Sequence, residues 1–210
     1  MKKSALSERG GTRVLCILAG GRSRRLGVDK RYLRFDGIPM LSWLYVRWQD
    51  WGPVLLGPQL DVRGWPGPVW PDRIPRYGPA HALQDALRRI RTTVVFFPVD
   101  LPWISPYVLR LLLERCDGDT CAYDGHVFHN TVYFIPVGVL HPQAVPAQPV
   151  SRFQTWCTMS RIDRVAVQRT PDDIPWWRDV DTVEDFRFWQ TFWIRRGHRL
   201  DWPATVRSAA

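Results

Sequence analysis

Val14-Leu-Cys-Ile-Leu18, followed directly by Ala19-Gly-Gly-Arg-Ser-Arg-Arg-Leu-Gly27, is the stretch that decides the fold. Its first part is a short, uninterrupted apolar run, which is typical of a strand buried on both faces. Its second part is a glycine-rich loop. In α/β proteins, ligands bind beyond the carboxyl ends of parallel strands. The stretch therefore predicts both a fold class and the place of a functional site.

The rest of the chain alternates short apolar segments with segments of helical periodicity. Further strands are expected at 54–56, 94–99, 121–123, 132–135 and 165–167. Helices are expected at 39–49, 80–91, 106–115 and 182–194. Such alternation predicts an α/β fold with three layers, Rossmann-like, in which helices cover both faces of a mainly parallel sheet.

The organisation along the chain is that of one domain. We expect it to span residues 12–194, with the non-periodic residues 195–210 forming a loose tail. The Pro-rich stretches 57–75 and 141–149 are expected to be surface connections, because no repeat or composition shift marks them as linkers.

Composition indicates a globular protein, since 45% of the 210 residues are hydrophobic and 23% are charged. Apolar runs such as 94–99 are far too short to cross a bilayer, and Lys2 and Lys3 are followed by polar residues. The four cysteines form no C-x-x-C pair. We therefore predict a cytoplasmic protein with reduced thiols and no membrane partner.

The charge pattern argues against a nucleic-acid partner. The formal net charge is +9, but the arginines are spread along the chain and form no tail or basic run. Lys30 is the only lysine after Lys3. Within a chain that otherwise uses arginine, this lysine stands out as a candidate functional residue.

The glycine-rich loop is suited to binding phosphates. Gly20 and Gly21 leave backbone N–H groups open to close approach, and the arginines and Lys30 that follow supply positive charge. The loop lacks the G-x-G-x-x-G spacing of dinucleotide-binding proteins and the Lys-Ser/Thr ending of a Walker A loop. A dehydrogenase or P-loop ATPase is therefore disfavoured, whereas a solvated surface turn stays open as the alternative.

A longer match narrows these alternatives. Leu18-Ala-Gly-Gly-Arg-Ser-Arg-Arg-Leu-Gly27 with Asp29-Lys30 resembles L-A-G-G-x-S-x-R-M-G-x-D-K, the opening signature of the molybdenum cofactor guanylyltransferase family and its nucleotidyltransferase relatives. The resemblance extends over residues 14–190. Four further segments are similar to family motifs in the same order: Leu33-Arg-Phe-Asp-Gly-Ile-Pro-Met-Leu41, Arg76-Tyr-Gly-Pro79, Phe97-Pro-Val-Asp-Leu-Pro102 and Asp179-Val-Asp-Thr-Val-Glu-Asp-Phe186.

The resemblance implies a nucleotide-diphospho-sugar transferase-like fold and a Mg²⁺-dependent enzyme of molybdenum cofactor biosynthesis. Its reaction would transfer GMP from GTP to the terminal phosphate of molybdopterin, with release of pyrophosphate. Molybdoenzymes or their chaperones would be further partners. Because both substrates are anions, the basic charge balance fits this reaction without a nucleic acid.

The resemblance also implies roles for individual residues. Its catalytic residues would be Arg25, Lys30 and Asp100. The nucleotide would be bound by Leu18, Ala19, Gly20, Gly21, Arg25, Lys30, Asp72, Gly78 and Pro79. The metal would be held by Asp100, with Asp181 or Asp179 as second ligand. Each carboxylate also has a structural alternative, because Asp is common in turns and at helix N-termini.

The match departs from the family where the base and the acceptor are chosen. Ala80-His81-Ala82 stands where the family has Leu-Ala-Gly, so a methyl group replaces a hydrogen near the nucleotide path. His129-Asn130-Thr131 replaces His-Pro-Thr, and Asp179-Val-Asp181 replaces Asn-x-Asn. His126 and His129 have no further metal ligand near them in the sequence.

Two alternatives to the guanylyltransferase therefore stay open. One is a related enzyme that uses CTP or another phosphorylated acceptor. The other is a non-catalytic descendant that binds a nucleotide or a protein partner, with an aromatic cluster as its docking surface. Such a cluster is more often core and helix packing; it comprises Trp176, Trp177, Trp189 and Trp193.

Overall fold

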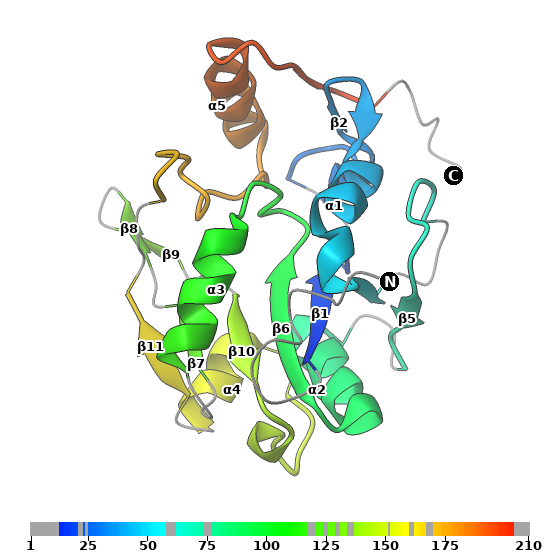
Figure 1. Cartoon of the computed structure of the whole chain (residues 1–210), viewed down its shortest axis with the longest axis vertical. Coiled ribbons are helices and arrows are strands. Elements are labelled where there is room, and N and C mark those ends of the chain that lie inside the picture. Colours follow the sequence, from blue (N-terminus) through cyan, green and yellow to red (C-terminus); the bar gives the residue numbers. More distant parts are fainter. Residues whose placement is uncertain are drawn as a thin grey trace.

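A seven-stranded sheet forms the middle layer of the computed structural model (Figure 1). The structure describes residues 13–20, 23, 25–57, 62–73, 77–116, 121–123, 126–128, 131–133, 137–150, 152–159, 162–166 and 170–203. The strands are β1 (Arg13–Leu18), β4 (Val54–Gly57), β5 (Val69–Pro71), β6 (Thr93–Pro98), β7 (Cys121–Tyr123), β10 (Gly138–Leu140) and β11 (Asp163–Val165). Their order across the sheet is β11-β7-β10-β6-β1-β4-β5.

The sheet is mainly parallel, as the sequence predicted. β1 lies in the middle and pairs in parallel with both β6 and β4, and β4 pairs in parallel with β5. β11 and β7 are also parallel to each other. β10 runs antiparallel to its neighbours β6 and β7.

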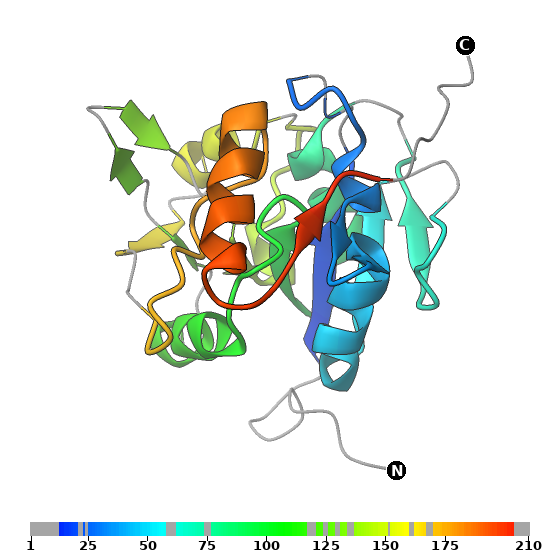
Figure 2. The ribbon, with the colours of Figure 1, turned by 90° about the horizontal axis from the view of Figure 1, so that it is seen from above.

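Helices cover both faces of the sheet, which confirms the predicted three layers. The α-helices are α1 (Met40–Trp48), α2 (Pro79–Ile90), α3 (Pro106–Arg115), α4 (Phe153–Met159) and α5 (Val183–Ile194). Figure 2 shows α1, α3 and α5 on one side of the sheet and α2 and α4 on the other. In β1, Leu15 and Ile17 belong to the core under α1 and α3, and Cys16 and Leu18 to the core under α2.

Local sequence signals explain where these helices begin. Ser105 accepts a hydrogen bond from the Tyr107 N–H and Pro106 opens α3. Thr182 and Asp185 form a reciprocal capping box at the start of α5. In the described part of the chain, no helix is long and apolar enough to span a membrane.

Several short elements differ from the prediction. β5 lies inside the Pro-rich stretch 57–75, where Pro71 is tolerated because β5 is an edge strand. β10 and α4 were not predicted, because segments this short carry little periodicity. The strand expected at 132–135 is β9 (Thr131–Tyr133), which pairs with β8 (His126–Phe128) outside the main sheet.

The segment after α5 is not the loose tail that the sequence predicted, as far as residue 203. β12 (Leu200–Asp201) pairs with β2 (Arg34–Phe35), which pairs in turn with β3 (Ile38–Pro39). The Asp36 carboxylate accepts from the Arg199 N–H at 2.8 Å and lies 2.8 Å from Nδ1 of His198. The prediction failed because β12 pairs with a strand far away in the sequence, and such pairing leaves no periodic pattern in the residues of β12 itself. Residues 204–210 lie outside the described residues.

The aromatic cluster proposed as a docking surface is mostly core. Trp176, Trp189 and Trp193 are buried, and Trp177 is partly buried against the same core. Trp189 packs on Trp103, with 4.1 Å between ring centroids. The docking interpretation of this cluster is therefore wrong, because burying these rings against the sheet removes a large apolar area from water.

The cysteines only partly follow the prediction of reduced thiols. Cys16 and Cys157 are buried and keep their thiols, and burial raises the pKa of Cys16 well above its usual value. Cys116 is disulfide-bonded. It lies at the C-cap of α3. The absence of a C-x-x-C pair in the sequence gave no sign of this disulfide.

Close backbone contact at the carboxyl ends of β1 and β4 requires a glycine. Gly57 has a φ of +100°, and a Cβ built there would lie 3.1 Å from the Gly20 nitrogen and 3.5 Å from Oδ1 of Asp72. Any larger residue at position 57 would push against the glycine-rich loop. Gly52 also has a positive φ, of +58°, but a Cβ there would meet no atom within 4 Å.

This contrast gives a stability prediction. Gly57→Ala should lower the free energy of unfolding by about 2 kcal/mol or more, because it combines an unfavourable φ with a backbone clash. Gly52→Ala should cost only about 1 kcal/mol, the ordinary penalty of a left-handed residue. Urea denaturation of both variants measures the difference, and equal losses would contradict the close approach.

Candidate active site

The carboxyl ends of β1, β4, β5 and β6 meet at one edge of the sheet. The Ala19 N–H donates to the Leu56 carbonyl at 2.9 Å, and the Val99 N–H donates to the Leu18 carbonyl at 2.8 Å. The loop after β1 is therefore held between the ends of β4 and β6. Gly20, which begins this loop, is exposed. Gly21 lies outside the described residues.

The second half of the loop is a tight turn that positions Lys30. The N–H groups of Leu26 and Gly27 both donate to the Ser23 carbonyl, at 3.1 Å each. The buried Ser23 hydroxyl accepts from the Lys30 N–H at 3.2 Å. Lys30 then begins the short helix η1 (Lys30–Tyr32), for which Asp29 is the N-cap. The backbone of Lys30 is fixed by this turn.

Lys30 lies at the centre of the candidate site. Its Nζ is 3.0 Å from Oδ2 of Asp100 and 2.8 Å from Oδ1 of Asp181. The side chain of Lys30 is only 10% exposed, and those of Asp100 and Asp181 are 27% and 18% exposed. A charge held away from water is costly unless it is paired, and the two carboxylates supply that pairing. The structure thus brings together three residues that the sequence singled out separately.

Secondary structure positions the two carboxylates. Asp100 lies in the turn that follows β6, and Asp181 lies just before α5. The Val180 N–H donates to the Asp100 carbonyl at 2.9 Å, which joins these two segments directly. Arg25 forms a second ion pair with Asp181, although its own side chain is 73% exposed. Two cations therefore face Asp181.

Asp179 has a different environment from Asp181. The pKa of Asp179 is raised to about 6, chiefly by burial; the negative charges of Asp100 and Asp185 add to this shift, and the positive charges of Lys30 and Arg25 oppose it. Its backbone carbonyl accepts from Nε1 of Trp189 at 3.2 Å, which connects this segment to α5. Of the two candidate second carboxylates, it is Asp181 that shares Lys30 with Asp100.

Asp72 follows β5 and belongs to a separate part of the same edge. Burial raises the pKa of Asp72 to about 6; the positive charge of His81 opposes this shift and the negative charge of Asp85 adds to it. Gly78, with a φ of +96°, and Pro79 begin α2 beside this carboxyl group. The N-terminal N–H groups of such a helix favour an anion.

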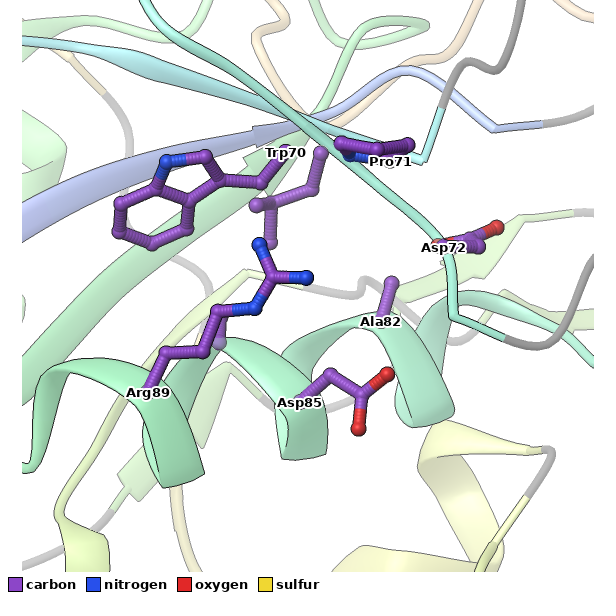
Figure 3. Close-up of a pocket in the computed structure, with 8 residues that line it drawn as sticks. Trp70, Pro71, Asp72, Ala82, Asp85 and Arg89 are labelled. Atoms are coloured by element: carbon purple, nitrogen blue, oxygen red, sulfur yellow. The ribbon is translucent and has the colours of Figure 1, made fainter.

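A pocket lies between β5 and α2 beside Asp72 (Figure 3). The Arg89 side chain projects from α2 toward the strand that carries Trp70 and Pro71, and Asp85 lies on the same helix. The pocket lining also includes Ala82, so the methyl group that replaces the family glycine faces this space. Acidic and basic side chains thus line the same pocket as Asp72, which the sequence predicted to bind the nucleotide.

Sequence reasoning missed a buried polar pair on α2. Nδ1 of His81 lies 3.8 Å from Oδ2 of Asp85, and both side chains are nearly inaccessible to solvent. Tyr77 packs on the His81 ring, with 5.0 Å between ring centroids. The i,i+4 spacing of a histidine and an aspartate on a predicted helix was the signal available in the sequence.

The residues fit a divalent cation shared with a triphosphate. Oxygens of Asp100 and Asp181 converge on one point, which the Lys30 ammonium occupies. Among the described residues, no group of three or more His, Cys, Asp or Glu side chains could hold a metal alone. Mg²⁺ is often bound by one or two carboxylates plus substrate phosphates and water, and this donor set matches that pattern.

Comparison with known families decides where the chain belongs. The family model of the MobA-like NTP transferase domain matches residues 15–167, which include most of β1, the glycine-rich loop, Lys30 and Asp100. The chain belongs to the MobA-like NTP transferase family. The resemblance inferred from the sequence motifs is thereby confirmed.

Relatives within this family carry the name molybdenum cofactor guanylyltransferase. The one from Xanthomonas euvesicatoria pv. vesicatoria is 36% identical over 107 residues, covering 48% of this chain and 55% of the relative. The one from Acidovorax sp. (strain JS42) is 34% identical over 105 residues, covering 47% of this chain and 50% of the relative. The chain spans about half the length of the relatives it matches.

Solved structures confirm the fold of the MobA-like domain. Molybdopterin-guanine dinucleotide biosynthesis protein A from Archaeoglobus fulgidus superposes with a TM-score of 0.68 at 15% identity, covering 88% of this chain and 100% of that one. A nucleotidyl transferase from Methanothermobacter thermautotroptrophicus gives a TM-score of 0.63 at 15% identity, covering 89% and 100%. At 15% sequence identity, the similarity to these two structures shows a shared fold alone.

The raised pKa of Asp72 gives a pH-dependent stability prediction. The folded protein binds this proton more tightly than the unfolded chain, whose carboxyl has a pKa near 3.8. For this group, the free energy of unfolding therefore falls as pH rises from about 4 to about 6, and then levels off. In Asp72→Asn this carboxyl group is gone, so the variant does not lose stability in this way. Its free energy of unfolding relative to that of the wild type should therefore increase from about pH 4 to about pH 6.

Urea denaturation at pH 4, 5, 6 and 7 measures this effect. Asp50→Asn, which neutralises an exposed carboxylate in η2 (Gln49–Trp51), is the matched control. Its stability relative to wild type should not increase across the window. A constant difference between Asp72→Asn and wild type at all four pH values would contradict the raised pKa.

Proposed function

We propose that this protein is a Mg²⁺-dependent nucleotidyltransferase that transfers GMP from GTP to the terminal phosphate of molybdopterin and releases pyrophosphate. The observation that carries the proposal is the convergence of Asp100 and Asp181 on Lys30, beside a glycine-rich loop at the sheet edge. The names of the relatives within the MobA-like family support the choice of substrates.

The triphosphate would lie along the loop after β1. The backbone of Leu18, Ala19, Gly20 and Gly21 would approach the phosphates closely, and Arg25 and Lys30 would neutralise their charge. Gly78 and Pro79 would contribute the N-terminus of α2. These groups position the α-phosphorus for in-line attack by a phosphate oxygen of molybdopterin.

The reaction needs positioning and charge neutralisation. A bond forms between the acceptor oxygen and the α-phosphorus, and the bond from the α-phosphorus to the bridging oxygen breaks, so pyrophosphate leaves. Asp100 and Asp181 would hold Mg²⁺, with Asp179 behind them. When bound, Mg²⁺ would neutralise charge on the phosphate oxygens. No covalent protein intermediate is needed.

Asp72 and the pocket beside α2 would contribute to base selection. A carboxylate accepts hydrogen bonds from N–H groups, and guanine presents two adjacent donors on one edge. Cytosine presents an amino group as well, and Ala82 lines the pocket in place of the family glycine. CTP or another phosphorylated acceptor is therefore the second candidate.

The proposal places this reaction in the cytoplasm. The finished dinucleotide cofactor would pass from this protein to molybdoenzymes or their chaperones. A pull-down of candidate molybdoenzymes with cofactor-loaded protein would test this transfer, and retention of the cofactor by the transferase in their presence would oppose it.

Nucleotide binding gives the first test. With GTP and Mg²⁺ together, the thermal midpoint should rise, because a ligand that binds only the folded state stabilises it. CTP, ATP and UTP, each with and without Mg²⁺, serve as matched comparisons. A rise with CTP alone would move the assignment to the related cytidylyltransferase, and no rise with any nucleotide would oppose the enzyme.

Turnover gives the second test. Lys30→Met and Asp100→Asn should each lower kcat at least about a hundredfold, because each removes a charge placed for the transition state. Release of pyrophosphate from GTP with Mo-molybdopterin as acceptor measures this loss. Arg199→Met removes a 77% exposed cation and should keep wild-type turnover. Wild-type rates in Lys30→Met would refute the site, provided its circular dichroism shows a folded chain.

A further inference from the structure

Lys30 occupies the point at which the two metal-binding carboxylates of the proposed site converge. Its Nζ lies 3.0 Å from Oδ2 of Asp100 and 2.8 Å from Oδ1 of Asp181. An ammonium group and a divalent cation cannot share this point, because both are positive and both need the same oxygens. The structure therefore raises the question of how the metal enters.

We propose that Lys30 is the counter-ion of Asp100 and Asp181 in the nucleotide-free protein, and that a divalent cation enters only when a triphosphate draws Lys30 away. This inference rests on the proposed assignment of Asp100 and Asp181 to the metal. It makes Lys30 a residue that couples metal binding to nucleotide binding, in addition to its contact with phosphates.

Charge balance at the site supports this exchange. Lys30 faces Asp100 and Asp181, and Arg25 forms a further ion pair with Asp181. The two cations neutralise the two carboxylates, so little negative charge is left to attract a divalent ion. Asp179, the third carboxyl group here, interacts with Asp100, Lys30 and Arg25. A triphosphate brings several negative charges, which compete with the carboxylates for both cations.

The side chains involved can make this movement without refolding. Lysine carries its charge on a flexible four-carbon stem, so the ammonium can move by several ångströms while the backbone stays in place. The Lys30 backbone is held independently by the Ser23 hydroxyl. Arg25 is 73% exposed, so it is free to turn toward a phosphate. Both carboxylates are then left beside the triphosphate.

A static ion pair is the competing explanation. A lysine that only stabilises the fold would keep its place between Asp100 and Asp181 when a triphosphate binds. Exchange predicts that the triphosphate draws the ammonium group away, and that without Lys30 the two unpaired carboxylates attract a divalent cation. The metal affinity of the nucleotide-free protein tests whether Lys30 keeps the cation out, and the response of Lys30 Nζ to a triphosphate separates the two explanations.

Mn²⁺ binding to the full chain without nucleotide gives the first experiment, which tests whether Lys30 keeps the cation out. Electron paramagnetic resonance measures free Mn²⁺ during titration of wild type, Lys30→Met and the double variant Lys30→Met/Asp181→Asn. Lys30→Met should bind Mn²⁺ on the order of tenfold more tightly than wild type, a modest change for removing one adjacent charge. The added affinity should disappear in the double variant.

Arg199→Met is the matched control for net charge. It removes one cation from an exposed pair with Asp201, away from the two carboxylates, and should keep the Mn²⁺ affinity of wild type. Equal Mn²⁺ affinity in Lys30→Met and wild type would overturn the proposal. A gain in Arg199→Met as large as in Lys30→Met would also overturn it, because the effect would then be one of overall charge.

A second measurement uses the wild-type chain and does not depend on the folding of a variant. Only Lys2, Lys3 and Lys30 carry lysine nitrogens, so ¹⁵N-lysine labelling gives a simple NMR spectrum of the ammonium groups. Tripolyphosphate in the presence of a chelator should shift the Lys30 Nζ signal, and Mg²⁺ alone should leave it in place. A shift with Mg²⁺ alone and none with tripolyphosphate would overturn the exchange.

Tripolyphosphate has no base, so these results are independent of which nucleotide the protein uses. If GMP transfer fails while both measurements give the expected result, the proposed function is refuted and the exchange stands. If transfer succeeds while Lys30→Met gains no Mn²⁺ affinity, the exchange is refuted and the function stands.

Discussion

The ion pairs of Lys30 with Asp100 and Asp181 are the interaction on which the organisation of the site depends. They join the loop after β1, the turn after β6 and the segment before α5, which are far apart in the sequence. Burial makes these pairs mutually dependent, because removing one partner leaves an uncompensated charge away from water. Because the two carboxylates need a positive partner, a divalent cation can take the place of Lys30 when a triphosphate draws it away.

The sheet and the helices that cover it hold the segments of the site in place. The parallel strands β1, β4 and β6 end at one edge, so their loops come within a few ångströms of each other. Behind the site, Trp189 packs on Trp103 and donates to the Asp179 carbonyl, so α5 holds the acidic segment against the sheet. The aromatic residues that resembled a docking surface in the sequence thus support the position of Asp181.

The two halves of the site differ in chemistry. Around Lys30 the charges are paired and suited to phosphates and a metal. Around Asp72 the pocket carries Asp85 and Arg89, with His81 buried nearby, so this part of the site mixes acidic and basic groups. Departures from the family pattern occur in both halves: Ala82 lines the pocket near Asp72, and Asp181 contacts Lys30.

The sequence by itself determined the fold class, the family and the residues of the loop from Leu18 to Lys30, because these depend on local apolar runs and on a contiguous motif. It also named Asp100 and Asp181, but only the tertiary structure showed that both contact Lys30. β10, β12 and the core role of Trp176 likewise required the structure. Their positions depend on pairing and packing between segments distant in the chain, and such contacts leave no periodic trace in the sequence.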